Sequence, residues 1–171
     1  MGTWTWLRRL RAEDLAVLLA DPDPGERAHN VCAGIDPDIR PVEEIDTHRA
    51  WHALHVVLTG RESGGDPPAS YVVEDGTIRI EPDYEPGDLT LLTPPDVRAV
   101  AEYLATVPFD ALVAQRHPRM RADGDLSVYS FDIRDGQDMV ECGLLRRVFD
   151  DLTRFYRDAA AAGDAVMKDR G

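Results

Sequence analysis

The most informative stretch of the sequence reads Ile45-Asp46-Thr47-His48-Arg49-Ala50-Trp51-His52-Ala53-Leu54-His55-Val56-Val57-Leu58-Thr59-Gly60. Asp46 is a good helix N-cap, Ile45 before it can pack on the first turn, and Gly60 supplies a left-handed stop. Between these ends the apolar side chains point in nearly every direction around the helix. Because a helix that is apolar all round is buried all round, we expect residues 46–60 to form the central helix of the core.

The segments that follow this helix predict a small sheet. Residues 70–74 and 77–81 contain β-branched side chains and are joined by Asp75-Gly76, a pair that suits a type I′ hairpin turn. A third strand is expected at 88–92, after a turn rich in proline and glycine. These patterns indicate a mostly antiparallel sheet built from a hairpin.

Two helices are predicted with clear ends in the second half of the chain. Thr93 is a helix N-cap followed by Pro94 at the first helical position. The last helix shows one continuous apolar face from Met139 to Ala159 and closes at Gly163. The other expected elements here are a short helix at 109–116, a long loop at 117–136 with a possible strand at 126–131, and an edge strand at 165–167.

The first third of the chain completes the prediction. We expect a strand at 3–7, a helix at 11–20 and a helical turn at 26–32. Helices and a hairpin-built sheet without regular βαβ alternation are typical of an α+β domain. The sequence therefore predicts one domain over residues 1–171, with a small, mostly antiparallel sheet packed against a buried central helix and a long C-terminal amphipathic helix.

The composition agrees with one globular domain and limits its partners. The 171 residues are 43% hydrophobic, enough for one core at a length close to the usual ~100–150 residues of a domain. Thirty-two acidic residues against nineteen basic ones give a net charge of −13. Nucleic acids and anionic membrane surfaces both require clustered positive charge, so we expect neither as a partner. No apolar run reaches the ~18–20 residues of a membrane span.

The sequence also suggests where the protein resides. The N-terminus lacks the features of a signal peptide, and the two cysteines, Cys32 and Cys142, show no metal-ligand spacing. We therefore expect reduced thiols in a cytoplasmic protein. Lys168 is the one lysine among the nineteen basic residues. This arginine bias indicates a bacterial genome of high GC content.

Three histidines form the one constellation with possible chemistry. His48, His52 and His55 fall on one stripe of the expected helix at ~100° per residue, and imidazoles at such spacings can share a metal ion. A fourth ligand could come from the acidic segment before the helix. The simpler interpretation, which we favour, makes His52 and His55 core histidines with internal partners and leaves His48 near solvent.

Other reactive side chains give weaker patterns. Cys32 lies near His29, but spacing alone does not supply the base that a catalytic thiol needs. Cys142 falls on the apolar face of the last helix and is interpreted as packing. Asp132, Asp135 and Asp138 lack the ligand spacing of a calcium loop and are interpreted as turn and helix-start acids. No catalytic residue and no cofactor are therefore predicted.

Three segments together resemble a known family. They are 45–60 with its Trp-His-x-Leu-His core and final Thr-Gly, 91–97 with its Leu-Leu-Thr-Pro-Pro-Asp-Val, and the helix end at 152–166. This pattern resembles the YfbM-like family, small single-domain bacterial proteins grouped as a domain of unknown function (DUF1877). The stretches 21–44 and 119–136 depart from it, and His48 is not part of it. The resemblance implies an α+β fold and a cytosolic location, and it implies no activity.

Two functional hypotheses from different classes follow. The first is a non-enzymatic binding protein of the inhibitor or immunity type, whose acidic surface covers a basic protein partner and is steered to it by charge. The alternative is a small-molecule or metal-dependent activity at a pocket bordered by Trp51, His52 and His55. That alternative requires the imidazoles to reach a cavity, so burial of both with internal partners would remove its basis. We prefer the first hypothesis.

Overall fold

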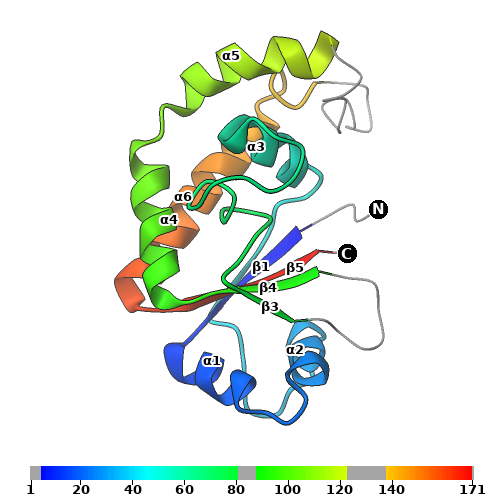
Figure 1. The fold of residues 1–171 in the computed structure, drawn as a ribbon, viewed down its shortest axis with the longest axis vertical. Helices are drawn as coiled ribbons and strands as arrows, with labels where there is room; N and C mark the ends of the chain where they lie inside the picture. The colour runs from blue at the N-terminus through cyan, green and yellow to red at the C-terminus, as the bar shows by residue number, and fades with distance from the viewer. Residues whose placement is uncertain (1–4, 81–87, 123–137, 171) are drawn as a thin grey trace.

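A computed structural model describes residues 5–80, 88–122 and 138–170 and confirms the α+β fold class. Its five strands form one antiparallel sheet in the order β2-β1-β5-β4-β3 (Figure 1). The strands are β1 (Thr5–Leu10), β2 (Glu43–Asp46), β3 (Ile78–Ile80), β4 (Asp88–Leu92) and β5 (Ala165–Arg170). The helices are α1 (Ala12–Leu19), α2 (Pro24–Cys32), α3 (Ala50–Thr59), α4 (Pro94–Thr106), α5 (Phe109–Ala122) and α6 (Leu144–Ala162).

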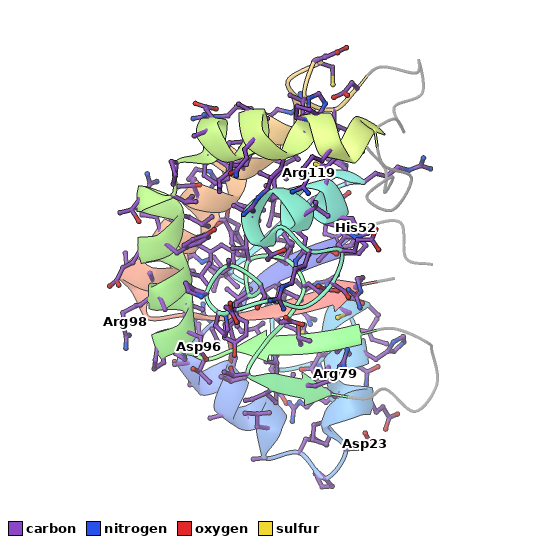
Figure 2. All side chains as sticks on the ribbon, turned by 45° about the horizontal axis from the view of Figure 1, so that its top comes forward. Asp23, His52, Arg79, Asp96, Arg98 and Arg119 are labelled. Carbon is purple, nitrogen blue, oxygen red and sulfur yellow. The ribbon has the colours of Figure 1, made fainter. Side chains whose placement is uncertain are left out.

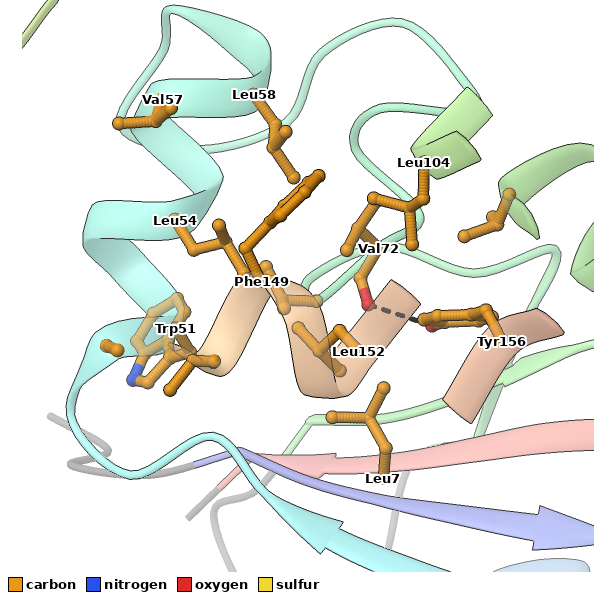
Figure 3. Close-up of a cluster of buried hydrophobic side chains, with 14 of the residues drawn as sticks. Leu7, Trp51, Leu54, Val57, Leu58, Val72, Leu104, Phe149, Leu152 and Tyr156 are labelled. Atoms are coloured by element: carbon orange, nitrogen blue, oxygen red, sulfur yellow. Dashed lines mark hydrogen bonds between the residues drawn. The ribbon is translucent and has the colours of Figure 1, made fainter. Parts of the chain in front are cut away.

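The sheet separates two hydrophobic cores of unequal size. Helices α1 and α2 lie on one side of it, and the other helices lie on the opposite side (Figure 1). The large core, on the α3–α6 side, includes Leu7 and Leu152 (Figure 3). Val166 belongs to the same core. The small core, on the α1–α2 side, includes Leu18 and Met167. Consecutive residues of β5 thus face different cores, as the alternation of side chains along a strand requires.

The central helix is buried as predicted, but it begins at Ala50, so the assignment of Asp46 as its N-cap was wrong. Asp46 ends β2, and its Oδ1 accepts the N–H of His48 at 2.7 Å. Both the N–H and the hydroxyl of Thr47 donate to the carbonyl oxygen of Thr5, at 3.1 and 2.9 Å. Pairing between the segments at 5–10 and 43–47 therefore continues past Asp46, and α3 begins only at Ala50.

The predicted hairpin through Asp75-Gly76 was also wrong. Residues 70–74 form turns, and β3 pairs with β4 with Ile78 opposite Leu91. Val72 and Val73 are exposed by only 0% and 1%, and both belong to the large core. In a strand these neighbours would point to opposite faces, whereas a turn lets both enter one core.

The last strand takes a more central position than predicted. Residues 165–167 were expected at the edge of the sheet, but β5 runs to Arg170 and pairs with both β1 and β4. Ala165 to Lys168 are all buried, because both faces of this strand are covered. An edge position would leave one row of backbone groups without a neighbouring strand.

The remaining differences concern element ends. Helix α5 extends to Ala122, beyond the predicted 109–116 and into the expected loop, and α2 begins at Pro24. Residues 3–4 of the first predicted strand and the possible strand at 126–131 lie outside the described residues. Helix α6 begins at Leu144, after a turn, so Cys142 is exposed and does not pack on the apolar face as predicted. Gly163 ends α6 in the left-handed conformation, as expected.

Candidate functional site

The three candidate ligand-binding residues, Trp51, His52 and His55, lie on α3. The Trp51 indole stacks on the His52 imidazole, with ring centroids 4.9 Å apart and planes inclined by 17°. Trp51 is 8% exposed and His55 is 0% exposed, whereas His52 is only partly buried. The His52 Nε2 lies 2.7 Å from the carbonyl oxygen of Glu62, and burial of the ring lowers the His52 pKa. Of the three side chains, His52 is therefore the one that a ligand from solvent would meet.

His48 is separated from this group. It lies in the turn before α3 with a positive φ of 51°, and its exposed imidazole Nδ1 is 3.1 Å from the Asp46 carboxylate. Among residues 5–80, 88–122 and 138–170, no group of three or more His, Cys, Asp or Glu side chains is arranged to hold a metal ion. The structure does not assemble the histidine stripe as a ligand set, since helix α3 starts two residues after His48.

Glu74 is the acidic partner of His55, and the sequence analysis did not single it out. Its Oε2 lies 3.0 Å from the His55 Nε2 and accepts the N–H of Gly64 at 2.8 Å. Its Oε1 accepts from the Arg170 guanidinium at 2.9 Å. Burial alone would raise the pKa of this carboxyl. The neighbouring His55, Gly64 N–H and Arg170 outweigh burial and lower the pKa to about 2.

Lys168 extends the same polar group beneath residues 61–77. It is 1% exposed on the central strand β5, and its Nζ donates to the carbonyl oxygens of Tyr71, at 2.6 Å, and Asp75. Burial lowers the pKa of this ammonium group to about 7, even though Asp75 and Glu74 lie nearby. We call His55, Glu74, Lys168 and Arg170 the Glu74 cluster. His55 of this cluster was named from the sequence, and the sole lysine in a chain with eighteen arginines was a second signal in the sequence that could have pointed to it.

In this conformation the Glu74 cluster has a structural role. Glu74 is ionised at neutral pH and is held by three groups, so it is a poor proton acceptor. The Arg170 guanidinium also lies over the Trp51 ring, 5.3 Å from its centroid. The cluster therefore joins α3, β5 and residues 61–77 through charged and aromatic contacts.

The cysteine and aspartate candidates do not form a second site. The Cys32 Sγ lies 3.5 Å from an Arg8 nitrogen, but burial raises the pKa of this thiol to about 12, so no reactive thiolate forms. Asp138 is buried and contacts the His117 Nε2 at 2.7 Å, which links α5 to the turn before α6. Asp132 and Asp135 lie outside the described residues.

A surface hollow of about 450 Å³ lies where α4, α5 and α6 meet. Phe109 and Phe149 stack at its base with centroids 3.9 Å apart. The Arg146 guanidinium lies 5.8 and 5.7 Å from the two ring centroids and is bound by Asp110 and Asp150. The protein's own arginine thus covers the aromatic face of this hollow.

The α1–α2 side of the molecule has a different surface. We define the α1–α2 layer as residues 11–42, the segment that covers the small core. Figure 2 places Asp23 in this layer and Arg119 on α5 at the opposite end of the molecule. All large apolar side chains that are exposed in the described part of the chain lie in this layer. They are Val17, Leu19, Ile35 and Val42, exposed by 43%, 39%, 67% and 46%.

Comparison with known proteins places this fold and these residues in a family. The profile of a domain of unknown function, DUF1877, matches residues 1–168. The chain belongs to the DUF1877 family. The crystal structure of a protein of unknown function, YfbM from Escherichia coli, is similar to this DUF1877 protein with a TM-score of 0.66. The similarity covers 98% of this chain and 99% of that chain at 18% sequence identity, and it shows a shared fold.

The family carries no assigned chemistry. No curated protein matches this DUF1877 chain, so the comparisons confirm the resemblance predicted from 45–60, 91–97 and 152–166 without adding an activity. No helix in the described ranges is long and apolar enough to cross a membrane. The function must therefore be argued from the surfaces and contacts of this chain.

Proposed function

We propose that this DUF1877 protein is a non-enzymatic binding protein of the inhibitor or immunity type, which contacts a basic protein partner through its α1–α2 layer. The observation that carries the proposal is the coincidence of exposed apolar side chains and excess negative charge in that layer. Apolar side chains stabilise a protein interface when they are buried, and charge of one sign selects and steers the partner. Both features are needed for a specific complex.

The α1–α2 layer carries more negative charge than helix α6. Residues 11–42 hold seven acidic residues against three arginines, a formal charge of −4. Arg27 contacts the carboxylates of Asp21, Asp36 and Asp38, at 3.0, 3.2 and 2.9 Å. The single positive charge of Arg27 therefore does not neutralise the three carboxylates that it contacts. Helix α6, by contrast, has four arginines and three aspartates over residues 144–162, a formal charge of +1.

The same layer is built to present these groups on a firm support. Leu15 and Leu18 of α1 are buried against the small core, which leaves Val17 and Leu19 on the outside. Asp23 caps α2 by accepting the N–H of Glu26 at 2.9 Å, and Asp36 accepts the N–H of Ile39 at 2.7 Å. A preorganised surface loses little conformational entropy on binding, which favours recognition without a large rearrangement.

The first test captures a partner by crosslinking at a chosen site on the protein. A photo-crosslinking residue is placed at Ile35 in the layer and, as a matched control, at the exposed Ala161 on α6. We expect a crosslinked partner from cells of the source organism at position 35 and not at position 161, and we expect that partner to be basic. Equal crosslinking at both positions, or an acidic partner, would contradict the proposal.

Purified complexes then test the physical basis. With Asp38→Asn combined with Glu26→Gln, we expect Kd for the partner to rise several-fold at low salt and its salt dependence to become weaker. Asp151→Asn on α6 combined with Glu102→Gln on α4 removes two exposed charges outside the layer and is the matched charge control, which should leave Kd unchanged. A Kd that is the same for all three proteins, or one that does not change between low and high salt, would refute a charge-steered interface.

A further inference from the structure

Residues 61–77 cross the α3–α6 side of the sheet between α3 and β3, and we call this segment the strap. It contains neither helix nor strand. The backbone-to-backbone hydrogen bonds that its described residues make all remain within it, for example from the Ser70 N–H to the carbonyl oxygen of Asp66. Backbone hydrogen bonds therefore do not attach the strap to the sheet or to a helix.

Side chains of the body attach the strap instead. The Lys168 Nζ donates to the carbonyl oxygens of Tyr71 and Asp75, and the Tyr156 hydroxyl donates to the carbonyl oxygen of Val72 at 2.8 Å (Figure 3). The Thr90 hydroxyl donates to the Glu74 carbonyl oxygen at 3.3 Å. These attachments come from β5, α6 and β4, and they all converge on residues 71–75.

The two ends of the strap are held by the His52 Nε2, which lies 2.7 Å from the Glu62 carbonyl oxygen, and by the Thr77 hydroxyl, which donates to the Leu91 carbonyl oxygen at 3.2 Å. The Glu74 side chain adds further attachments in the middle. It binds Arg170 of β5 and contacts His55 of α3, and it also accepts the N–H of Gly64 within the strap. Val72 and Val73 lie in the large core beside these polar contacts. Most of the polar and apolar contacts that hold the middle of the strap thus fall on residues 71–75.

The chain on the α3 side of the strap is suited to act as a hinge. Gly60 and Gly64 have φ values of 76° and 63°, in the left-handed region that glycine adopts without cost. Segments of a domain can open locally at lower free energy than global unfolding, and loops outside the hydrogen-bonded strands and helices are typical of such segments. The strap has no backbone ladder to the rest of the molecule, whereas β4 and β5 beneath it are each paired on both sides.

We propose that the strap opens as one unit ahead of global unfolding, and that opening presents Lys168, His55 and Glu74 to solvent. The strap then acts as a lid over the Glu74 cluster, which is closed in the conformation described above. This proposal is independent of the α1–α2 layer, since the strap lies on the opposite side of the sheet.

Lys168 provides a direct probe, because it is the one lysine of the chain and its amine is covered by the strap. The protein is pulsed with succinimidyl acetate, and acetylation of Lys168 is followed by mass spectrometry, with the α-amine as internal reference. The rate of global unfolding is measured in the same buffer. We expect Lys168 to be acetylated at least tenfold faster than global unfolding allows.

Variants separate local from global opening. Tyr156→Phe removes the hydroxyl that binds the Val72 carbonyl oxygen and should raise the rate of Lys168 acetylation roughly tenfold. Thr47→Val is the matched control, since it removes one buried hydroxyl that binds the Thr5 carbonyl oxygen between β1 and β2. It should leave the acetylation rate unchanged, even though it lowers global stability.

Two results would overturn the proposal. The first is acetylation of Lys168 at the rate of global unfolding in the unaltered protein. The second is an equal acceleration by Tyr156→Phe and Thr47→Val, in proportion to their loss of global stability. Either result would mean that the strap leaves the sheet only when the whole domain unfolds.

Discussion

Glu74 shows how one side chain connects segments that are far apart in the sequence. Its carboxylate joins the strap to Arg170, 96 residues away, and to His55 on the central helix. A carboxyl whose pKa is lowered on folding stabilises the native state only in its ionised form. The folded-state pKa of about 2 lies below the usual 4.5. The stabilisation is therefore complete above pH 4.5 and is lost as the pH falls toward 2.

We expect Glu74→Gln to lower the free energy of unfolding by about 1–3 kcal/mol at neutral pH, because a charge-assisted contact is lost. The variant should also lose less stability than the unaltered protein between about pH 5 and about pH 3. Urea unfolding at several pH values measures both effects. Glu62→Gln, at an exposed position of the same strap, is the control and should follow the unaltered protein. Parallel pH profiles for Glu74→Gln and the unaltered protein would contradict this assignment.

The end of the strap, just before β3, is determined by a close approach to β4. A Cβ atom on Gly76 would lie 2.7 Å from the Leu91 carbonyl oxygen and 2.9 Å from the Thr90 Cβ. The sequence Asp75-Gly76 indicated a hairpin turn, but the glycine is required because β4 passes beside it. Glycine is used both for turns and for such contacts, so the residue type alone could not distinguish them.

Gly76→Ala should therefore destabilise the protein by about 1–3 kcal/mol through a backbone clash. The amides of β3 and β4 should lose protection in hydrogen exchange more than those of α6. Gly34→Ala is a useful comparison, since its φ is 72° but nothing lies within 4 Å of the added Cβ. That change should cost only about 1 kcal/mol from the backbone conformation. An equal cost for the two substitutions would show that the approach of Leu91 is unimportant.

At the scale of the whole molecule, β5 couples two cores. Val166 packs in the large core and Met167 in the small core, and both lie on the strand between β1 and β4. A change in either core should therefore be transmitted through the same strand. The α1–α2 layer proposed to bind a partner and the strap lie on opposite sides of this shared sheet.

Leu18→Ala in the small core and Leu152→Ala in the large core should each lower the free energy of unfolding by about 2–5 kcal/mol, since both side chains are 0% exposed. We expect each variant to unfold in one cooperative transition in calorimetry, with a lower Tm. A second, separate transition in Leu18→Ala would show that the α1–α2 layer unfolds independently of the large core.

Local patterns in the sequence determined three of the helices of this protein. The apolar stripe and Gly163 predicted α6, Thr93 and Pro94 predicted the start of α4, and the apolar circumference of 50–58 predicted a buried α3. Each of these signals depends on neighbours within one or two helical turns, where spacing in sequence fixes spacing in space. The family resemblance rested on the same segments, and the match over residues 1–168 confirmed it.

Tertiary structure decided the features that depend on pairing between distant segments. Asp46 had the chemistry of an N-cap, but pairing of β2 with β1 placed it at the end of a strand. The central position of β5, the turns at 70–74 and the contact of Glu74 with His55 likewise arise from residues that meet only when the chain is folded. Sequence patterns report local preference and burial, whereas strand order and ion pairing depend on which surfaces meet, and that is settled by the packing of the whole chain.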